Sequence, residues 1–553
     1  MSARNPVSQL ATHEVTNQPP PLEDYNLYDQ DAALSEALNR EGAGWAEERV
    51  RALGAELGSA RVAELATQAN RYDPELKSFD RYGHRIDEVV FHPAYHDMMT
   101  LGMKHGIPSI AWTADQPGGH VAHTAMEFML AQVEPGVCCP LTMTYAGVPA
   151  LRNQPEVAAE WEPRLTATEY DPRSIPASEK TAATIGMAMT EKQGGSDVRS
   201  NTTRAEPTGQ DGEYLLTGHK WFCSAPMSDA FLTLAYTENG QSCFLVPRWK
   251  PDGSRNAFYI QRLKDKLGNR SNASSEIEYN GTWAQMVGEE GRGVRTIIEM
   301  VHHTRLDTVL APAGFMRQAV AQATHHAAHR SAFQRRLNQQ PLMQNVLADL
   351  AVESEAATAL VMRVARAFDE SETDAGAKPF ARIAVAVAKY WVNKRVPGHV
   401  YEAMECHGGA GYVEESIMPR LYREAPLNGI WEGSGNVICL DVLRAIHREP
   451  ESLAAFLEEL EAARGVDRRY DQMLGRLKDR LSDQADLEFR ARRLVEDMAV
   501  TLQAALLLKH APKAVADAFC ASRLDRDAGT AYGTLPRGLA LEEIIERARP
   551  KLD

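Results

Sequence analysis

The spacing of apolar residues changes twice along the chain, and this change restricts the possible folds more than any other feature. From about residue 31 to 180, apolar residues recur at helical intervals, as in VRALGAELGSARVAELATQAN. Between about 181 and 290 the chain carries short β-rich runs, such as YLLTGHKWFCS and AFLTLAYT, which Gly, Asn and Asp separate. Helical spacing returns at about 291. The sequence therefore predicts an all-helical, all-β, all-helical order along its 553 residues.

A chain of this length is too long for one hydrophobic core, so two to four domains are expected. We predict an extended arm and helical domain at 1–180, a middle β domain at 181–290, a helical domain at 291–446 and an extra helical region at 447–553. The first 30 residues are rich in Pro, Asn and Gln. They are expected to form an arm that packs on the body of the protein or on a neighbouring subunit.

Three glycine-containing segments carry the candidate site residues. AMTEKQGGSDVRS at 188–200 places two adjacent glycines between hydroxyl side chains. Because glycine has no Cβ, such a loop can lie against a flat or charged ligand, while hydroxyl and N–H groups bond to ring heteroatoms or a pyrophosphate. The other two segments are ECHGGAGYVEESIMPRLYRE at 405–424 and IWEGSGN at 430–436. The first segment, taken alone, would most often be an ordinary turn.

Taken together and in this order, the three segments resemble the signatures of the flavin-dependent acyl-CoA dehydrogenases. The resemblance implies an α+β, mostly α fold: an N-terminal helical domain, a central β-barrel-like domain and a C-terminal four-helix bundle. This chain adds a helical C-terminal region. The resemblance also implies FAD as cofactor, an acyl-CoA thioester as substrate and a homotetramer. The run at 17–45 and the tail beyond Ile446 resemble the branch of this family associated with the bacterial response to alkylating agents.

The resemblance assigns the FAD contacts residue by residue. Met189 and Thr190 match the positions that meet the polar edge of the flavin ring, and Trp221 matches the aromatic residue that covers one ring face. An aromatic residue in a β-rich run is otherwise usually part of the core. The complete set of expected FAD contacts is Met189, Thr190, Gly195, Ser196, Trp221, Phe222, Ser224, Arg330, Phe333, Gly408, Gly409, Ser434 and Asn436.

One of these motifs departs from the family pattern. Arg330 and Phe333 match the Arg-x-x-Phe motif that reaches the FAD of a second subunit, where the guanidinium fork of an Arg suits a diphosphate. Gln334 stands where the family usually has Gly, and Pro341 where it usually has a Gln that contacts the cofactor. Part of the contact between subunits is therefore expected to differ from that of the family.

Glu432 is the expected catalytic base. Oxidation of an acyl-CoA removes the α-proton with a base while the β-hydride passes to the flavin, and that base must be a carboxylate in a mostly apolar pocket. Glu432 stands between Trp431 and Gly433, where the resemblance implies the base. Some members of the family carry the base on an earlier helix, directly before an Arg. Here that Arg is Arg305 and Thr304 precedes it, so only Glu432 is available.

The composition is that of an ordinary soluble globular protein, with 44% hydrophobic and 24% charged residues. No run approaches the ~18–20 apolar residues that a membrane span needs. The start, MSARNPVSQLATHEV, lacks the apolar segment of a signal peptide. Seven scattered cysteines without metal spacing indicate reduced thiols. We therefore expect a cytoplasmic protein with no membrane partner.

The case for DNA binding depends on the C-terminal region. The net charge of −15 argues against it, but nucleic-acid binding requires only a local basic patch. Region 451–553 has 17 Lys and Arg against 19 Asp and Glu. Its cations could gather into a contact for double-stranded DNA, or form a solvated helix face with ion pairs. The family branch favours the first alternative. The expected DNA contacts are Arg490, Arg492, Arg493, Lys509, Lys513, Arg523 and Arg526.

Two groups of histidines have a spacing that could place two imidazoles on one helix face: His325, His326 and His329, and earlier His92 and His96. The later group has no acidic third ligand in step with it, and both groups are better interpreted as polar packing. No metal site is predicted.

The leading hypothesis is an FAD-containing protein of the adaptive response to DNA alkylation. It would bind double-stranded DNA through its C-terminal region and keep weak dehydrogenase activity toward an acyl-CoA such as isovaleryl-CoA. The alternative is a fully active acyl-CoA dehydrogenase of fatty-acid or branched-chain amino-acid catabolism, whose tail merely builds the oligomer. A flavin oxidase acting on a small electrophile is a third hypothesis.

Overall fold

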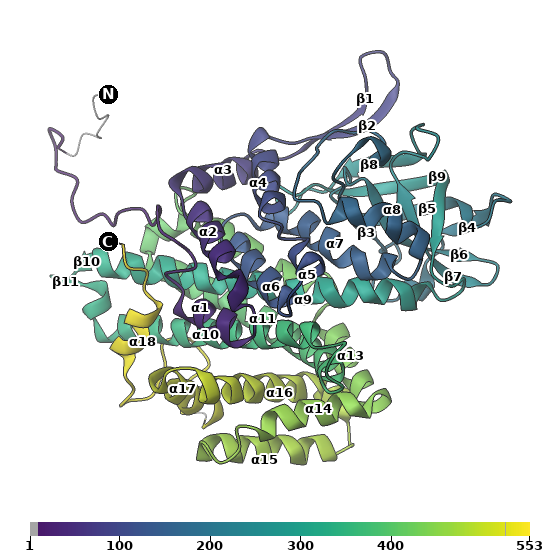
Figure 1. The fold of residues 1–553 in the computed structure, drawn as a ribbon. Coiled ribbons are helices and arrows are strands. Elements are labelled where there is room, and N and C mark those ends of the chain that lie inside the picture. The colour runs from purple at the N-terminus through teal and green to yellow at the C-terminus, as the bar shows by residue number, and fades with distance from the viewer. Residues whose placement is uncertain (1–8, 526, 553) are drawn as a thin grey trace.

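The computed structural model describes residues 9–525 and 527–552, and in them the protein is built mainly of helices, with one large sheet (Figure 1). The strands of that sheet gather at one end of the molecule, and long helices fill the rest. None of the helices in the described ranges has the long, nearly uncharged apolar stretch that crossing a membrane requires.

The N-terminal part is an extended arm followed by helices and one hairpin. Every residue of the helix at Gly119–Ala131 is buried, as expected for a helix that is apolar on most sides. The antiparallel hairpin projects away from the helices (Figure 1). The elements are α1 (Ala32–Arg40), α2 (Glu47–Leu57), α3 (Ala60–Arg71), β1 (Glu75–Phe79), β2 (Arg85–Val90), α4 (Pro93–Lys104), α5 (Ile110–Thr113), α6 (Gly119–Ala131), α7 (Pro135–Leu151) and α8 (Pro155–Leu165).

The arm packs on the helical body of its own chain. The N–H of Leu27 donates to the carbonyl oxygen of Gly54 (3.1 Å), and the N–H of Tyr25 to that of Gly58 (3.4 Å). A Cβ on Gly58 would overlap the Tyr25 carbonyl group, so only glycine permits this close approach. The packing matches one of the two arrangements expected for the arm.

The middle part is a sheet that closes on itself. Its strands are β3 (Ile185–Ala188), β4 (Arg204–Pro207), β5 (Glu213–Ser224), β6 (Ala230–Thr237), β7 (Gly240–Pro247), β8 (Phe258–Leu263) and β9 (Ser274–Val287). The order is β3-β6-β4-β5-β9-β7, with β8 on β9. β7 also pairs with β6, in register from Ala230↔Pro247 to Thr237↔Gly240. This pairing closes the β6-β4-β5-β9-β7 circuit and removes sheet edges there, which makes the domain barrel-like.

The helices after the sheet form a bundle. α9, α10 and α11 pack against one another, and α13 packs on α11 as the fourth helix. α9 is 37 residues long and connects the sheet to a small hairpin at the opposite end of the molecule (Figure 1). The elements are α9 (Gly293–His329), β10 (Ser331–Ala332), β11 (Arg335–Arg336), α10 (Pro341–Asp369), α11 (Ala377–Cys406), α12 (Met418–Glu424) and α13 (Gly435–Arg448).

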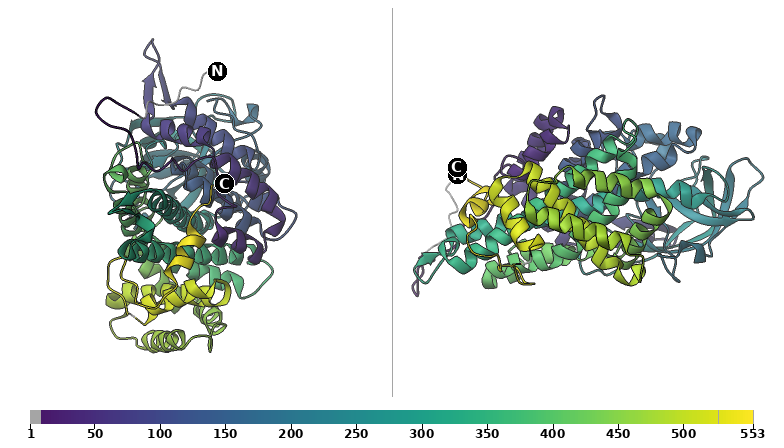
Figure 2. Two further views of the ribbon diagram at one scale, coloured as in Figure 1. Left: turned by 90° about the vertical axis from the view of Figure 1, so that its left-hand side faces the viewer. Right: turned by 90° about the horizontal axis from the view of Figure 1, so that it is seen from below.

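The C-terminal helices form a further layer on the bundle. They are α14 (Pro450–Glu461), α15 (Arg468–Ser482), α16 (Leu487–His510), α17 (Lys513–Phe519) and α18 (Leu541–Ala548). α16 packs on α10, α11 and α13. Figure 2, on the right, shows this layer lying across the bundle. One apolar cluster runs from the N-terminal helices through the bundle into α16. The extra region is therefore continuous with the main helical core.

Candidate active site

The loop after β3 holds the first expected FAD contacts. Met189 and Thr190 follow the end of β3 and are half-buried. The N–H of Trp221 on β5 donates to the carbonyl oxygen of Thr190 (2.7 Å), so the fold brings these contacts together. A Cβ on Gly195 would lie 2.5 Å from the Thr190 hydroxyl oxygen. Any larger residue at position 195 would therefore force the Thr190 side chain to shift, whereas glycine lets the loop fold closely over it.

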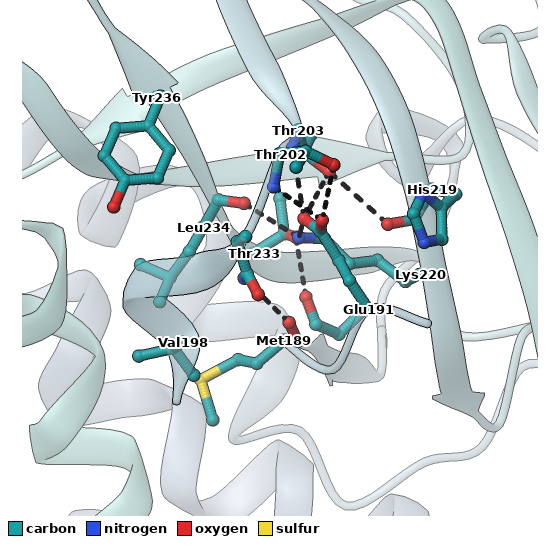
Figure 3. A network of polar contacts seen from close by, with 12 residues as sticks. Met189, Glu191, Val198, Thr202, Thr203, His219, Lys220, Thr233, Leu234 and Tyr236 are labelled. Atoms are coloured by element: carbon teal, nitrogen blue, oxygen red, sulfur yellow. Dashed lines mark hydrogen bonds and ion pairs between the residues drawn. The ribbon is translucent and has the colours of Figure 1, made fainter. Parts of the chain in front are cut away.

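A buried ion pair fixes this loop to the sheet (Figure 3). The side chains of Glu191 and Lys220 are fully buried, and Lys220 Nζ donates to Glu191 Oε1 (2.8 Å) and to the carbonyl oxygen of Leu234 (2.9 Å). Thr202 and Thr203 donate to the same carboxylate through their N–H and hydroxyl groups. Burial alone would raise the pKa of Glu191, but Lys220 and the threonine donors outweigh it and lower the pKa to about 2. The carboxylate thus joins the loop to β5 and β6.

The end of β5 presents an aromatic surface. Phe222 is 48% exposed, and Trp221 beside it is half-buried. Lys264 Nζ lies 3.3 Å from the centroid of the Trp221 ring and pairs with Glu276 (2.7 Å). A cation therefore covers one face of the indole, and a flat ligand would have to use the other.

Glu432 lies in the loop between η6 (Leu427–Gly429) and α13, and its carboxylate meets α9. The hydroxyl of Thr304 on α9 donates to Glu432 Oε2 (2.8 Å). The φ of Glu432 is 55°, in the left-handed region, where a residue with a Cβ is strained by about 1–2 kcal/mol. Arg305 Nε is 3.4 Å from the Glu432 carbonyl oxygen, and Arg305 Nη1 pairs with Asp441 (2.9 Å).

Apolar packing joins the flavin loop to the loop of Glu432. Met189 and Trp431 both pack against one buried cluster, formed by α7, α8, strands of the sheet and the start of α9. Cys139 of α7 belongs to this cluster, and burial raises the pKa of its thiol to about 12. The Ser224 hydroxyl and the charges of Lys266 and Glu432 act on the same thiol. The structure therefore brings the β-domain contacts and the expected base into one region.

Ser434 and Asn436 begin the helix that follows Glu432. Ser434 is the N-cap residue of α13, and Asn436 lies in its first turn. Arg492 Nε on α16 donates to Asn436 Oδ1 (2.8 Å). A residue expected to contact FAD therefore contacts one expected to bind DNA.

A second group of expected FAD contacts lies at the far end of α9. Arg330, Gly408 and Gly409 line a cleft of about 1540 Å³, and the N-terminal arm forms part of its wall. Arg330 Nη1 donates to the carbonyl oxygen of Asn17 in that arm (2.6 Å). Among the described residues, no atom comes within 4 Å of a Cβ built on either glycine. The space beside the glycines is therefore open.

Phe333 stands at the tip of the β10–β11 hairpin and is 92% exposed. Phe333 and Gln334 form its two-residue turn with φ values of 51° and 64°. Positive φ at both positions is typical of a type I′ turn, which favours Gly or Asn. This explains why a Gly suits position 334 and shows that Gln334 adopts the same conformation.

The two groups of expected FAD contacts cannot serve one ligand site within one chain. Thr304 and Arg330 are 26 positions apart along α9 and its C-terminal end, which corresponds to about 39 Å at a rise of 1.5 Å per residue. In Figure 1 the sheet and the β10–β11 hairpin lie at opposite ends of the molecule.

Some of the expected DNA contacts form ion pairs, whereas Arg492, Lys509 and Lys513 are exposed and form none with the described residues. Arg523 is mostly buried and pairs with Asp349 and Glu353 of α10. Lys509 and Lys513 lie near the C-terminal end of α16, whereas Arg490, Arg492 and Arg493 lie near its start. The other paired arginines are Arg490 with Asp483, and Arg493 with Glu496 and Asp497. Arg526 lies outside the described residues.

A buried polar trio between α6 and α9 was not expected from the sequence. In the part of the chain that the structure describes, His123, Glu127 and Asp307 are close enough together to share a metal ion. His123 Nε2 is 3.1 Å from Asp307 Oδ1, and Nδ1 is 2.7 Å from the Ile107 carbonyl oxygen. Burial lowers the pKa of His123, but Asp307 outweighs it and raises the pKa to about 9. Burial raises the pKa of Glu127 to about 8. A protonated Glu127 beside a His123–Asp307 ion pair makes the trio neutral without an ion.

Three residues near Glu432 and Trp221 are not among the expected site residues: Thr304, Lys264 and Cys139. From the sequence, Thr304 is only excluded as the base. Its hydroxyl, one position before Arg305, is nevertheless a possible hydrogen-bond donor to the base. Lys264 and Cys139 have no sequence signal, because their partners come from other elements of the fold.

Comparisons with known proteins bear on each part of the chain. Residues 17–172 match the family model of the adaptive response protein AidB N-terminal domain. Residues 186–282 match the acyl-CoA dehydrogenase middle domain, and residues 291–447 match the acyl-CoA dehydrogenase C-terminal domain. The chain is 46% identical over 520 residues to AidB of Escherichia coli strain K12, covering 94% of this chain and 95% of that protein.

Solved structures have the same architecture. Caenorhabditis elegans ACDH-11 in complex with C11-CoA superposes with a TM-score of 0.85 at 27% identity, over 95% of each chain. A glutaryl-CoA dehydrogenase from Mycobacterium smegmatis in complex with FADH2 has a TM-score of 0.54 at 18% identity, over 63% of this chain and 86% of that one. This second likeness concerns the fold alone. The predicted fold class is confirmed.

Proposed function

Because the chain belongs to the acyl-CoA dehydrogenase family and is AidB-like over nearly its whole length, we propose that it is an FAD-dependent oxidoreductase that oxidises an acyl-CoA thioester at the Cα–Cβ bond. Homologues in this family are flavoproteins. The observation that carries the proposal is the contact of Glu432 with Thr304, next to Trp431, which packs against the same apolar cluster as Met189.

The residues of the first group fit FAD. The absence of a Cβ at Gly195 lets the loop fold closely over Thr190, and the hydroxyls of Thr190 and Ser196 can donate from that loop. Trp221 offers an aromatic surface at the end of β5. We assign the ring contacts to Met189, Thr190 and Trp221, and a pyrophosphate contact to Ser196. When bound, FAD supplies the acceptor for the hydride that leaves Cβ.

Glu432 would remove the α-proton of the thioester. Thr304 donates to Oε2, which leaves Oε1 to take the proton. The electron pair of the broken Cα–H bond then forms the Cα=Cβ double bond as the hydride leaves Cβ. Trp431, packed on the cluster shared with Met189, would shield this side of the reacting carbons from water.

We also propose that a second copy of the chain completes the cofactor site, as in a homotetramer. Arg330, Phe333, Gly408 and Gly409 are about 39 Å from the Glu432 region along α9 and border an open cleft and an exposed hairpin tip. Mass photometry of the purified protein tests the oligomer. A monomer that retains FAD would contradict this part of the proposal.

The catalytic proposal is tested by anaerobic titration of the FAD-loaded protein with a panel of acyl-CoA thioesters that includes isovaleryl-CoA. The visible flavin band should bleach. Glu432→Gln should keep the flavin but bleach at least about 100-fold more slowly, since it removes the general base. Fast, stoichiometric bleaching would favour the catabolic alternative, and slow bleaching the weak activity expected of an AidB-like protein. No bleaching by any thioester would overturn the proposal.

A second candidate function is binding of double-stranded DNA in the response to DNA alkylation, through the C-terminal region. The resemblance of residues 17–172 to the AidB N-terminal domain supports it. Within the described ranges, Arg492, Lys509 and Lys513 have no carboxylate within ion-pair distance, which leaves these cations available for phosphate contacts.

The DNA proposal is tested by fluorescence anisotropy of a labelled duplex at several salt concentrations. Lys509→Glu/Lys513→Glu should weaken binding and lower the salt dependence by about two phosphate contacts. Lys77→Glu/Lys378→Glu changes two exposed lysines elsewhere and alters the net charge equally, so it serves as the control. Equal effects of the two double variants would refute a specific role for the C-terminal lysines.

A further inference from the structure

A lysine beneath the loop of Glu432 binds that loop through all of its N–H groups. Lys389 of α11 is only 1% exposed. Its Nζ donates to the carbonyl oxygens of Asn428 (3.0 Å), Trp431 (2.9 Å) and Gly433 (2.8 Å). An ammonium group has three donors, and here one short stretch of chain provides all three acceptors.

The conformation of this stretch requires an anchor. Glu432 has a φ of 55° and Gly433 a φ of 103°. A non-glycine residue in the left-handed region persists only where its surroundings hold it there. The Trp431 carbonyl belongs to the peptide group before Glu432, and the Gly433 carbonyl to the peptide group after Gly433. Lys389 therefore fixes the backbone on both sides of the strained pair, and with it the direction of the Glu432 side chain.

The other contacts of the loop cannot replace this anchor. Arg305 Nε reaches the Glu432 carbonyl oxygen only at 3.4 Å. The Trp431 indole N–H donates to Asn428 Oδ1 (2.6 Å), a contact within the loop itself. Thr304 holds the carboxylate but not the backbone. Lys389 is thus the main link between the backbone of this loop and the helical bundle.

The charge of Lys389 lacks a conventional partner. In the described part of the chain, no carboxylate lies within ion-pair distance of its Nζ. The charged groups that act on it are Glu432 from the loop, Arg305 from α9 and Lys394 from its own helix. Burial is the main cause that lowers the pKa of Lys389 to about 7. Glu432 raises this pKa, whereas Arg305 and Lys394 lower it further. A buried ammonium is costly unless hydrogen bonds satisfy it, and the loop carbonyls do so.

We propose that Lys389 is the positioning residue of Glu432: its three hydrogen bonds hold the loop in the left-handed conformation that places the carboxylate beside Thr304. This inference rests on the proposed role of Glu432 as the base. It assigns to Lys389 a task in orientation, with no contact to the substrate.

The experiment compares full-length, FAD-loaded wild type with Lys389→Met and Lys389→Gln. Lys180→Met is the matched control, since Lys180 is also buried but donates to Asp229 (2.7 Å) and to the Asp171 carbonyl oxygen (3.0 Å), neither of which belongs to the Glu432 loop. Crystal structures give the φ of Glu432 and its distance to Thr304. Stopped-flow reduction by the most active thioester of the panel gives the limiting rate and the half-saturating concentration.

In Lys389→Met, the backbone of Glu432 should leave the left-handed region, and its carboxylate should lose the hydrogen bond from Thr304. The limiting rate of flavin reduction should then fall about 100-fold, the effect that a misplacement of a catalytic group by about 1 Å can have. The half-saturating concentration should not change. Lys389→Gln keeps an amide donor, so its limiting rate should lie between the rates of Lys389→Met and wild type. Should Lys389→Met fail to fold, the Gln variant alone decides the comparison.

The inference is overturned when Glu432 keeps its conformation in both Lys389 variants, or when Lys180→Met slows reduction as much as they do. A wild type that no thioester reduces would refute the proposed function instead. In that case the crystal structures still decide whether Lys389 positions Glu432.

Discussion

Replacing Lys220 by Met should lower the free energy of unfolding by about 3 kcal/mol, near the lower end of the range for breaking a buried ion pair on one side. Met fills most of the lysine volume but leaves the fully buried Glu191 carboxylate without its cation. Gln193, Thr202 and Thr203 still donate to that carboxylate, which is why the loss should not reach the upper end of the range.

The same pair predicts a pH dependence. The pKa of Glu191 in the folded protein is about 2, below its value of about 4.3 in an unfolded chain. A lowered pKa contributes stability that is present above the unfolded value and lost as the pH falls through 4.3 toward 2. Lys220 is the largest cause of the lowering, so Lys220→Met should lose less stability than wild type between about pH 5 and pH 3.

Urea unfolding at pH 7, 5 and 3, followed by circular dichroism and tryptophan fluorescence, measures both effects. Glu191→Gln/Lys220→Met removes both charges and should recover at least half of the loss, because no unpaired charge remains buried. FAD retention after ultrafiltration should fall in Lys220→Met, since Glu191 holds the loop of the expected cofactor contacts. A loss below about 1 kcal/mol, or a double variant no more stable than the single one, would refute the reasoning.

Three further predictions concern other parts of the chain. The pKa of Glu127 is about 8 in the folded protein, above its unfolded value of about 4.3, so stability falls as the pH rises from about 4.3 toward 8. Glu127→Gln should flatten this fall in thermal melts from about pH 5 to 8.5, and an unchanged slope would contradict the prediction. Thr304→Val removes the donor to the carboxylate of Glu432, the proposed base, and should slow flavin reduction about tenfold in stopped flow. An equal rate would count against a role for this contact. Gly58→Ala forces a Cβ against the Tyr25 carbonyl group and should release the N-terminal arm from the helical body. Proteinase K should then cleave the arm at new sites, which mass spectrometry identifies. Full protection of the arm from cleavage would show that it adapts to the substitution.

The kind and order of the elements could be predicted because their signals are local. The run AFLTLAYT corresponds to β6 at Ala230–Thr237, and YLLTGHKWFCS lies within β5 at Glu213–Ser224. Periodicity cannot reveal that β7 pairs with β9, from Cys243↔Val287 to Leu245↔Gln285, and so closes the sheet, since this pairing joins strands that are far apart in the sequence.

The candidate site was predictable only in part. The resemblance indicated Glu432, but its partner Thr304 is 128 positions away, and no local pattern joins the two. Lys389 had a usable signal: a single lysine in the apolar run ARIAVAVAKYW needs polar partners if that face is buried. The basic residues of the C-terminal region could not be sorted from composition. Arg523 pairs with Glu353 and Asp349 of α10, which are 170 and 174 positions away in the sequence. Composition alone cannot show that the charge of Arg523 is neutralised by these distant residues.

The N-terminal arm and the far cleft are physically linked. Arg330 is bonded to the Asn17 carbonyl, and the Asn17 side chain exchanges hydrogen bonds with the backbone of Ser331. The guanidinium expected to reach the FAD of a second copy is therefore held by the arm of its own chain. From residue 17 onward, the arm belongs to the part of the chain that matches the AidB N-terminal domain, so this part also shapes the proposed contact between subunits. Changes in the arm should therefore lower cofactor retention at that contact first. Arg330 is about 39 Å along α9 from Thr304, which contacts the proposed base Glu432.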